Sequence, residues 1–427
     1  MKRLLVVSPD YASHYLPMSA VAHQLGEYGY EVTVATGPGL ASRVRADGFG
    51  YAELVLGAGS NPGVIRSEDQ EREERRRLEG FFAASRQGMV ATLRYQAEHR
   101  LDDLLWEPGR VAARLRVVLV EVGPTHVLVD QLAFGATAAL RGLGQPFIAF
   151  HPGHPSALAG DAPYGVPPRI PTRFEGERDG LADLEVLCRL VSARFTERYN
   201  QVIHTLDPGA PPVDNAFTAT SESLTLVNYP EELAGHYRGP ATARMIGWSV
   251  PSHRLQTTLD WEPQGPVIYI SLGSFFSARD DILQRLVSAF RDRPVSVALA
   301  TGVTDPSRLG SLPDHWLVET YLRQPALLAR ADLVITHGGN NSVTEALRAG
   351  VPLLVGPLST DQFAGAADIE EAGLGMAFDP NHDTPADISE LAMTVLEGTH
   401  PSVASALGER LRDHSGPEIA AELIDSL

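Results

Sequence analysis

Short apolar segments typical of buried parallel strands recur along this chain, and helical patterns separate most of them. Near the N-terminus, residues 4–7 and 31–36 predict two such strands, and residues 17–28 predict a helix between them. Strand, helix and strand in this order form a crossover unit, in which parallel strands lie side by side and helices cover the sheet. The same alternation restarts at residues 267–271 and continues through 333–336. The sequence therefore predicts an α/β fold with two doubly wound, Rossmann-like parallel sheets.

The length of the chain favours more than one domain, because 427 residues exceed the usual size of a single core. We predict an N-terminal domain over 1–250, a linker rich in proline and glycine over 251–264, and a C-terminal domain over 265–405. Residues 406–427 predict a final helix that could pack back on the N-terminal domain. Ligands of open α/β sheets bind at the carboxyl ends of the strands, so two such domains should face each other across a ligand cleft.

Charge and cysteine content exclude several classes of protein. The formal net charge of −18 argues against a nucleic-acid partner, because a phosphate backbone needs a basic face. Cys188 is the only cysteine, so no disulfide framework or cysteine-rich metal site can form. No apolar run approaches the ~18 residues needed to span a membrane, and the first strand turns polar at Ser8, unlike a signal peptide. We therefore expect a cytoplasmic protein with no membrane partner.

The strongest functional signal follows the predicted strand 333–336. The sequence there reads HGGNNS at residues 337–342, before a helix predicted near 343–349. Two glycines let the backbone approach a ligand closely, and a helix N-terminus binds anions. Taken alone, this turn also fits an ordinary strand-to-helix connection capped by Asn or Ser. Glu345, one helical turn further on, could accept two hydrogen bonds from a ribose diol, which favours a nucleotide site.

This region resembles the donor signature of family-1, UDP-glycosyltransferase-like inverting glycosyltransferases, which have the GT-B fold. The bacterial natural-product and macrolide enzymes are the most similar type. The matching stretches, at the family's spacing, are residues 321–324, 336–345, 350–352 and 357–362. The resemblance implies that the diphosphate is held by Ser274, His337, Gly339, Asn341 and Ser342. It further implies that Glu345 holds the ribose, that Asp361 and Gln362 hold the sugar hydroxyls, and that Tyr321 and Gln324 lie beside the base.

The base-binding stretch departs from the family pattern. Tyr321 stands where the family has its stacking tryptophan, and Arg323 stands where the family has proline. The identity of the base is therefore open. A pair of ribose hydroxyls at Glu345 and a hydroxyl-rich sugar at Asp361 favour a UDP-hexose such as UDP-glucose, and a dTDP-deoxysugar is the alternative.

The candidate catalytic residues lie in the N-terminal half. His14 follows the first strand in the sequence His-Tyr-Leu-Pro, and Asp130 ends the strand predicted at 127–129. A single histidine near a helix start is usually structural or merely exposed. However, His14 and Pro17 resemble the family's His-x-x-Pro motif, in which the histidine is the general base, and Asp130 falls where the family has its carboxylate partner. The resemblance implies a single displacement that inverts the anomeric configuration.

The acceptor should bind the N-terminal domain near residues 60–90 and 151–175. Residues 152–178 are rich in proline and glycine and predict a long irregular loop. The loop has few charges, which favours an apolar small molecule, and the predicted acceptor contacts are His151, Pro163 and Tyr164. His151 and His154 also invite a metal interpretation, but their short, stiff spacing without a nearby carboxylate favours loop histidines. We expect no metal and no cofactor other than the nucleotide-sugar co-substrate.

Other functions stay compatible with these motifs. A sugar-nucleotide epimerase would act on the donor alone, and a non-catalytic partner of a glycosyltransferase would need no base. The presence of both His14 and Asp130 favours a transferase. The expected partners are a nucleotide diphosphate sugar and a small-molecule acceptor, with a homodimer left open. The acceptor's identity, the exact sugar, the position modified and the atom glycosylated (O, N, S or C) are not encoded in any motif.

Overall fold

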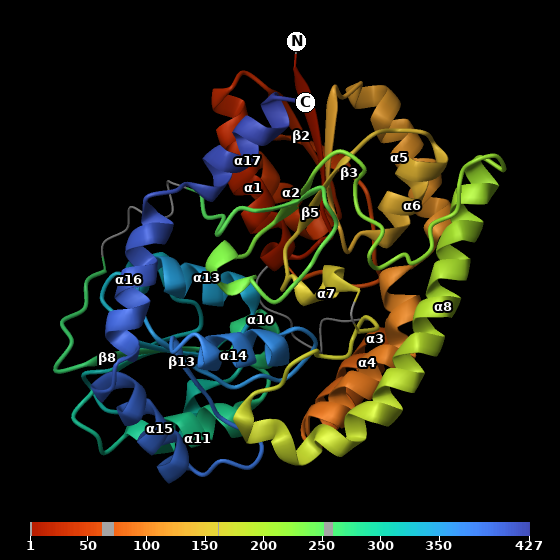
Figure 1. Cartoon of the computed structure of the whole chain (residues 1–427). Helices are drawn as coiled ribbons and strands as arrows, with labels where there is room; N and C mark the ends of the chain where they lie inside the picture. Colours follow the sequence, from red (N-terminus) through yellow and green to blue (C-terminus); the bar gives the residue numbers. More distant parts are fainter. Residues whose placement is uncertain (1, 62–71, 161, 252–258) are drawn as a thin grey trace.

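The computed structural model of the chain describes residues 2–61, 72–160, 162–251 and 259–427 (Figure 1). These residues form one sheet of seven strands and one of six, and every neighbouring pair of strands is parallel. Helices cover both sheets, so the predicted α/β fold with two doubly wound domains is confirmed. Part of the predicted linker, residues 252–258, lies outside the described residues.

The N-terminal sheet has the strand order β3-β2-β1-β4-β5-β6-β7. Its strands are β1 (Arg3–Val7), β2 (Glu31–Thr36), β3 (Gly50–Glu53), β4 (His126–Asp130), β5 (Ile148–His151), β6 (Thr225–Val227) and β7 (Ala243–Met245). Its helices are α1 (Ala12–Glu27), α2 (Ala41–Ala46), α3 (Arg72–Ser85), α4 (Met89–Leu104), α5 (Pro108–Val122), α6 (Phe134–Gly142), α7 (Ser156–Ala159) and α8 (Leu181–Leu206). The order reverses between β1 and β4, which leaves a crevice at their carboxyl ends.

The C-terminal sheet has the order β10-β9-β8-β11-β12-β13 and reverses between β8 and β11. Its strands are β8 (Val267–Ser271), β9 (Ser296–Ala300), β10 (Leu317–Glu319), β11 (Leu333–Thr336), β12 (Leu353–Val355) and β13 (Gly375–Ala377). Its helices are α10 (Gly273–Phe276), α11 (Asp280–Phe290), α12 (Gln324–Leu328), α13 (Asn340–Ala349), α14 (Gln362–Glu371) and α15 (Pro385–Glu397). Both predicted phosphate loops, after β8 and after β11, therefore flank the reversal point.

Helices α3, α4 and α8 extend from the N-terminal domain along the side of the C-terminal domain (Figure 1). Phe81 of α3 joins the apolar core around β8 and α11 of the C-terminal domain. Its ring lies 5.1 Å from the ring of Phe275, measured between centroids, in an edge-to-face arrangement. The two domains are thus joined by aromatic packing as well as by the chain itself. Cys188 on α8 is buried, and burial raises the pKa of its thiol.

The C-terminal residues form two helices where one was predicted. Helix α16 (His400–Arg412) packs on α13, and Leu407 and Leu411 enter the core of the C-terminal domain. The first helix ends at Arg412, and α17 (Gly416–Asp425) begins after Ser415. The side chain of Ser415 caps α17 by accepting a hydrogen bond from the N–H of Glu418. Helix α17 packs on α1, and both chain ends lie near it (Figure 1). No helix of the described residues has the length and apolar character to cross a bilayer.

Candidate active site

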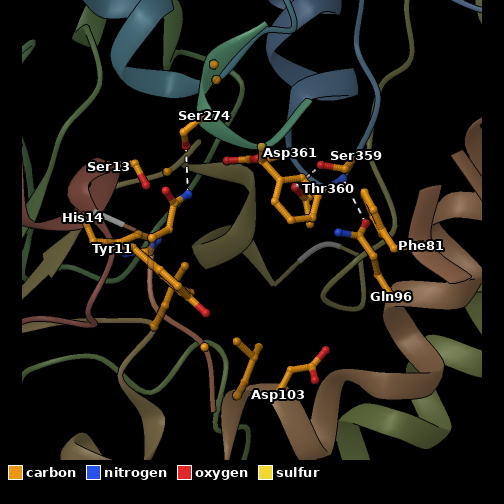
Figure 2. Close-up of a pocket in the computed structure, with 18 of the residues that line it drawn as sticks. Tyr11, Ser13, His14, Phe81, Gln96, Asp103, Ser274, Ser359, Thr360 and Asp361 are labelled. Atoms are coloured by element: carbon orange, nitrogen blue, oxygen red, sulfur yellow. Dashed lines mark hydrogen bonds between the residues drawn. The ribbon is translucent and has the colours of Figure 1, made fainter. Parts of the chain in front are cut away.

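A cavity of about 590 Å³ lies between the two domains (Figure 2). The N-terminal domain contributes the start of α1 and parts of α3 and α4, and the C-terminal domain contributes the loops after β8, β11 and β12. The sequence-predicted residues in its lining are His14, Tyr164, Ser274, His337, Gly339, Asn341, Ser342, Asp361 and Gln362. Those outside the lining are Asp130, His151, Pro163, Tyr321, Gln324 and Glu345.

His14 and Asp130 form a hydrogen-bonded pair at the N-terminal side of the cavity. Nδ1 of His14 lies 2.8 Å from Oδ2 of Asp130. The His14 side chain is 20% exposed and the Asp130 side chain is fully buried. The second carboxylate oxygen of Asp130 accepts the N–H of Leu132 at 2.8 Å, which fixes the carboxylate. This leaves Nε2 as the ring nitrogen of His14 that is free of Asp130.

The electrostatic environment of His14 favours its protonated form. Burial alone would lower the pKa of His14, because a charged imidazolium loses hydration. The charge and hydrogen bond of Asp130, with a further contribution from Asp361, outweigh burial and raise the pKa above its ordinary value. A proton taken up by this imidazole is thus stabilised by a buried carboxylate. The pair has the physical properties of a general base and its orienting partner.

Helix α1 begins earlier than the sequence suggested, and His14 lies in its first turn. The helix starts at Ala12, so Pro17 is inside it. Proline has no N–H to donate to the carbonyl four residues before it. That carbonyl belongs to Ser13, and it accepts instead from Nδ2 of Asn341 in the C-terminal domain at 2.7 Å. The proline therefore leaves free a backbone acceptor that joins the two sides of the cleft beside His14.

The glycine-rich turn after β11 leads directly into α13. Gly338 has φ of +85°, in the left-handed region that favours glycine. The N-cap of α13 is Gly339, and the helix begins at Asn340. The helix prediction at 343–349 therefore began too late, because Asn340 and Ser342 lie in the first turn and no side chain caps the helix. This arrangement directs the N-terminus of α13 toward the cavity, where it is suited to an anion.

His337 is packed between two glycines that cannot be enlarged. A Cβ atom added to Gly339 would lie 2.6 Å from Nε2 of His337, and one added to Gly273 would lie 2.6 Å from its Cε1. Gly273 also has φ of +69°. Burial lowers the pKa of His337 to about 4, against a smaller opposing influence from Asp361. His337 is therefore neutral at physiological pH and can donate or accept a hydrogen bond without carrying charge.

Polar side chains of the predicted phosphate site also reach across the cleft. Nδ2 of Asn61 donates to Oγ of Ser274 at 2.8 Å (Figure 2). Nδ2 of Asn340 lies 2.7 Å from the carbonyl oxygens of both Pro152 and Asn228. Asn61 lines the cavity from the N-terminal domain and falls within the predicted acceptor region near residues 60–90, although no motif marks it. The structure thus brings Ser274, Asn341 and Ser342 together around the turn that holds His337.

The residues predicted for the base and ribose lie beyond the lining of this cavity. Nε2 of Gln324 donates to Oε2 of Glu345 at 2.8 Å, and the hydroxyl of Tyr269 donates to Oε1 of Gln324 at 3.3 Å. These contacts join the start of α12 to α13, so Gln324 and Glu345 form one polar unit. Tyr321 is 62% exposed, and its ring is accessible to a planar partner. Their nucleotide contacts stay predictions.

Asp361 and Gln362 differ in how they are held. Oδ2 of Asp361 accepts the backbone N–H of His154 at 2.8 Å, so the carboxylate touches the N-terminal domain. Oε1 of Gln362 accepts the N–H groups of Leu358 and Ser359 at 2.9 and 3.0 Å. Asp361 faces the cavity (Figure 2), whereas the amide of the buried Gln362 mainly organises its own loop. Sugar binding by Gln362 would use its remaining amide hydrogen.

The predicted acceptor residues divide between two cavities. Tyr164 lines both the main cavity and an adjoining one of about 110 Å³, and His151 and Pro163 line only the smaller one. The Tyr164 ring stacks on Phe217 at 4.3 Å between centroids, and burial raises the pKa of its hydroxyl to about 12. His151 is buried and burial lowers its pKa, so it is a neutral group in the wall. Residues 62–71 and 161 of the predicted acceptor region lie outside the described residues.

The predicted acceptor region near residues 60–90 includes Asn61 and Phe81 of the N-terminal wall, but sequence reasoning missed the rest of that wall of the main cavity. Helices α3 and α4 supply Phe81, Tyr95, Gln96 and Asp103, and the loop before α1 supplies Tyr11 (Figure 2). Phe81 and Tyr95 give this wall an aromatic surface, whereas Asp103 is paired with Arg77 at its edge. No motif marks these residues, because their role depends on how two helices pack beside another domain.

His154 belongs to a buried network between the domains. Its Nε2 lies 2.9 Å from Oδ2 of Asp368 on α14. The carboxylate of Asp368 also accepts from the hydroxyls of Tyr229 and Tyr237, at 3.2 and 3.0 Å, and from Arg169 at 3.3 Å. A carboxylate shared in this way explains how His154 can be buried. Within the described part of the chain, no three His, Cys, Asp or Glu side chains are grouped to hold a metal.

Comparison with known proteins gives a family for the C-terminal domain and a fold for the whole chain. Residues 287–426 match the family described as Erythromycin biosynthesis protein CIII-like, C-terminal domain. A segment of 165 residues is 35% identical to NDP-glycosyltransferase YjiC of Bacillus licheniformis, covering 38% of this chain and 41% of that protein. Demethyllactenocin mycarosyltransferase of Streptomyces fradiae is 33% identical over 199 residues, covering 45% and 41%. These two matches span about two fifths of each relative's length.

Other similarities extend over the full chain. Zeaxanthin glucosyltransferase of Pseudescherichia vulneris is 26% identical over 444 residues, covering 100% of this chain and 98% of that protein. The crystal structure of the glycotransferase of kitacinnamycin superposes with a TM-score of 0.71 at 23% identity, over 100% of this chain and 98% of the other. Glycosyltransferase VinC in complex with dTDP gives a TM-score of 0.67 at 19% identity, over 99% and 98%.

Two parallel-sheet domains that face each other across a cleft, with a glycine-rich helix N-terminus on one side, define the class of GT-B proteins. Within that fold, residues 287–426 match the C-terminal domain of the Erythromycin biosynthesis protein CIII-like family, and the relatives that the chain matches are named glycosyltransferases.

Proposed function

We propose that this chain is an inverting glycosyltransferase that moves a hexose from a nucleoside diphosphate sugar to a hydroxyl of a small, largely apolar acceptor. The observation that carries the proposal is that His14, paired with Asp130 at 2.8 Å, lines the same cavity as His337 and the N-terminus of α13. A proton acceptor and an anion site then flank one space. A sugar donor whose diphosphate lies at α13 would present its anomeric carbon between them.

In the proposed reaction, Nε2 of His14 removes the proton from the acceptor hydroxyl. The oxygen attacks the anomeric carbon, and the bond from that carbon to the diphosphate oxygen breaks. The nucleoside diphosphate leaves with the electron pair into the field of the α13 N-terminus. One displacement inverts the configuration, so an α-linked donor yields a β-glycoside. Asp130 supports the step by stabilising the imidazolium that forms on His14.

His337 contributes to the leaving group as a neutral donor in this proposal. Burial keeps its pKa at about 4, so it carries no positive charge at neutral pH. The rigid packing against Gly273 and Gly339 supports a fixed orientation of its ring. A preorganised neutral donor stabilises developing negative charge without the desolvation that a buried cation would suffer.

For the donor, we favour a UDP-hexose. A carboxylate can accept two hydrogen bonds from a ribose diol, and the two ribose hydroxyls of a uridine nucleotide would offer Glu345 more donors than a deoxyribose. The second candidate is a dTDP-deoxysugar, which is favoured by similarity to the mycarosyltransferase and to VinC bound to dTDP. Calorimetric titration with UDP and TDP distinguishes the two, and a preference for TDP would contradict our choice.

The test of transfer is donor turnover with and without acceptors. UDP-glucose and TDP-glucose are incubated with a panel of hydroxylated apolar compounds, and nucleotide release and glycoside formation are measured. We expect turnover that depends on acceptor, reduced roughly 10²- to 10⁴-fold in His14→Ala and unchanged in the control His204→Ala, an exposed position on α8. Donor conversion without acceptor would indicate the epimerase, and donor binding without any turnover would indicate the non-catalytic partner. Near-full activity of His14→Ala would refute the assignment of the base.

A further inference from the structure

The loop between β12 and α14 contains the only described non-glycine residue besides Glu107 that has a positive φ. That residue is Thr360, with φ of 42°. A β-branched side chain in the left-handed region is unfavourable, because its Cβ crowds the adjacent backbone. Thr360 directly precedes Asp361, the predicted sugar ligand. Surrounding contacts must therefore hold this strained conformation in place.

Successive N–H groups of this loop are bound by two glutamines, one from each domain. Gln362 accepts from Leu358 and Ser359 through Oε1, within the C-terminal domain. The N–H of the strained residue, Thr360, instead donates to Oε1 of Gln96 on α4 at 3.2 Å (Figure 2). The hydrogen bond that holds Thr360 in its left-handed conformation therefore comes from the N-terminal domain.

A second contact from the N-terminal domain holds the other side of the loop. The backbone N–H of His154 donates to Asp361, and His154 is itself anchored to Asp368 on α14. Asp361 is thus positioned by its own backbone, which follows Thr360, and by a bond to its carboxylate. The backbone conformation at Thr360 depends on the side chain of Gln96, which also lines the main cavity. The bond to the Asp361 carboxylate comes from a backbone N–H instead.

We propose that Gln96 is a positioning residue that holds the loop of Thr360 and Asp361 in the conformation needed to bind the donor sugar. The inference rests on the proposed function, since it assumes that Asp361 binds that sugar. Gln96 and Phe81 both line the main cavity from the N-terminal domain, on the wall that should contact the acceptor (Figure 2). The acceptor domain would therefore set the geometry of sugar recognition in the donor domain, without a direct contact between Gln96 and the nucleotide.

The proposal separates sugar binding from nucleotide binding, and calorimetry measures both. Dissociation constants of UDP and UDP-glucose, and of TDP and TDP-glucose in parallel, are compared in the full chain and in Gln96→Leu. We expect the nucleotide sugar to bind roughly 5- to 10-fold more weakly in Gln96→Leu, the effect of about one hydrogen bond, and the free nucleotide to bind within about twofold of the unmodified chain. Gln87→Leu, at an exposed position two residues after the end of α3 and outside the cavity lining, is the control and should change neither constant.

A second substitution tests the route through the strained residue. Glycine adopts a positive φ without crowding, so Thr360→Gly should reduce the need for the bond from Gln96. We expect the loss of affinity caused by Gln96→Leu to shrink at least twofold in the Thr360→Gly background. Equal weakening of nucleotide and nucleotide sugar, weakening of neither, or an undiminished loss in the double variant would each overturn the proposal. Failure of the unmodified chain to bind either nucleotide sugar would instead refute the proposed function.

Discussion

Asp130→Asn removes the carboxylate that orients and stabilises the proposed base. Asparagine has nearly the same shape, and its carbonyl oxygen can still accept the N–H of Leu132, which Asp130 accepts at 2.8 Å. The NH2 group of asparagine then faces Nδ1 of His14, where a carboxylate oxygen lies at 2.8 Å, so the variant loses the negative charge and also favours the neutral tautomer with its proton on Nε2. Loss of a hydrogen bond to a charged group alone costs about 1.5–3 kcal/mol, which is roughly 10- to 150-fold in rate. We therefore expect kcat/KM on the alkaline plateau to fall at least about 10-fold, and up to about 10⁴-fold if the unfavourable tautomer dominates.

The same variant should move the pH profile in a defined direction. The base must be neutral to accept a proton, so activity falls as pH drops through the pKa of His14. Asp130 raises that pKa, so the acid limb of the unmodified chain should lie above the ordinary histidine value. Without the charge, burial lowers the pKa, and the limb should shift to lower pH. The deficit of Asp130→Asn should thus be largest on the plateau and shrink toward acid pH.

Steady-state glycoside formation measured between about pH 5 and 9 gives both quantities, because it covers the ordinary histidine range on both sides. Asp413→Asn, an exposed position between α16 and α17, serves as the matched control and should follow the unmodified profile. A limb that stays in place, or one that moves to higher pH, would refute the view that Asp130 sets the protonation of His14. Loss of activity with an unchanged limb would leave Asp130 a structural residue only.

Two further substitutions test the packing around the site. Gly339→Ala places a Cβ atom 2.6 Å from the His337 ring, so nucleotide binding measured by calorimetry should weaken by about 1–3 kcal/mol. The control is Gly26→Ala, where nothing lies within 4 Å of the added Cβ atom, and it should have no effect. Equal nucleotide affinities of Gly339→Ala and the unmodified chain would refute the packing argument. Asp368→Ala removes the carboxylate shared by three buried polar side chains and the partly exposed Arg169, and it should lower the free energy of unfolding in denaturant by about 3–5 kcal/mol, against Asp413→Ala as control. A loss below 1 kcal/mol would show that water replaces the carboxylate.

The sequence was informative where function and local structure use the same residues. The turn at 337–342 follows an apolar strand, and its glycines are required by backbone conformation and by the close approach of the His337 ring. The order of strands and helices predicted both sheets, since parallel strands need crossovers. The contact between His14 and Asp130 followed from a resemblance, and the structure has that contact, although the roles of both residues stay predictions.

Element boundaries were less predictable, because tertiary contacts override local preference. Pro17 marked the expected start of a helix, yet α1 begins at Ala12, and the carbonyl left free by the proline is bound by Asn341. The long loop predicted at 152–178 includes the short helix α7 and leads into α8, which no sequence motif marked. The end of the chain was predicted as one helix, but its halves pack on different domains and must bend between them.

Most of the N-terminal wall of the main cavity could not be read from the sequence for a related reason. Gln96 and Thr360 are separated by 264 positions and meet only because α4 lies against the C-terminal domain. Phe81 reads as an ordinary apolar residue of an amphipathic helix, and it is one, but the core that it enters belongs to the other domain. Residues that act between domains leave no local periodicity, so a motif search finds each domain's own site and misses what joins the two.

His14 and His337, two of the histidines that line the cleft, have opposite electrostatic environments, and this difference supports a division of roles. Burial alone would lower the pKa of both rings. For His14, the carboxylate of Asp130 at 2.8 Å outweighs burial and raises the pKa. For His337, burial outweighs the influence of Asp361 and lowers the pKa to about 4. Neighbouring titratable groups whose environments push their pKa values apart are suited to different steps of a reaction. Of the two rings, only His14 has a pKa raised above the ordinary histidine value, which suits it to take up a proton. In the proposed reaction, a neutral His337 would stabilise the departing diphosphate and would not compete with His14 for the acceptor proton, so the packing around the two rings would set the direction of proton transfer.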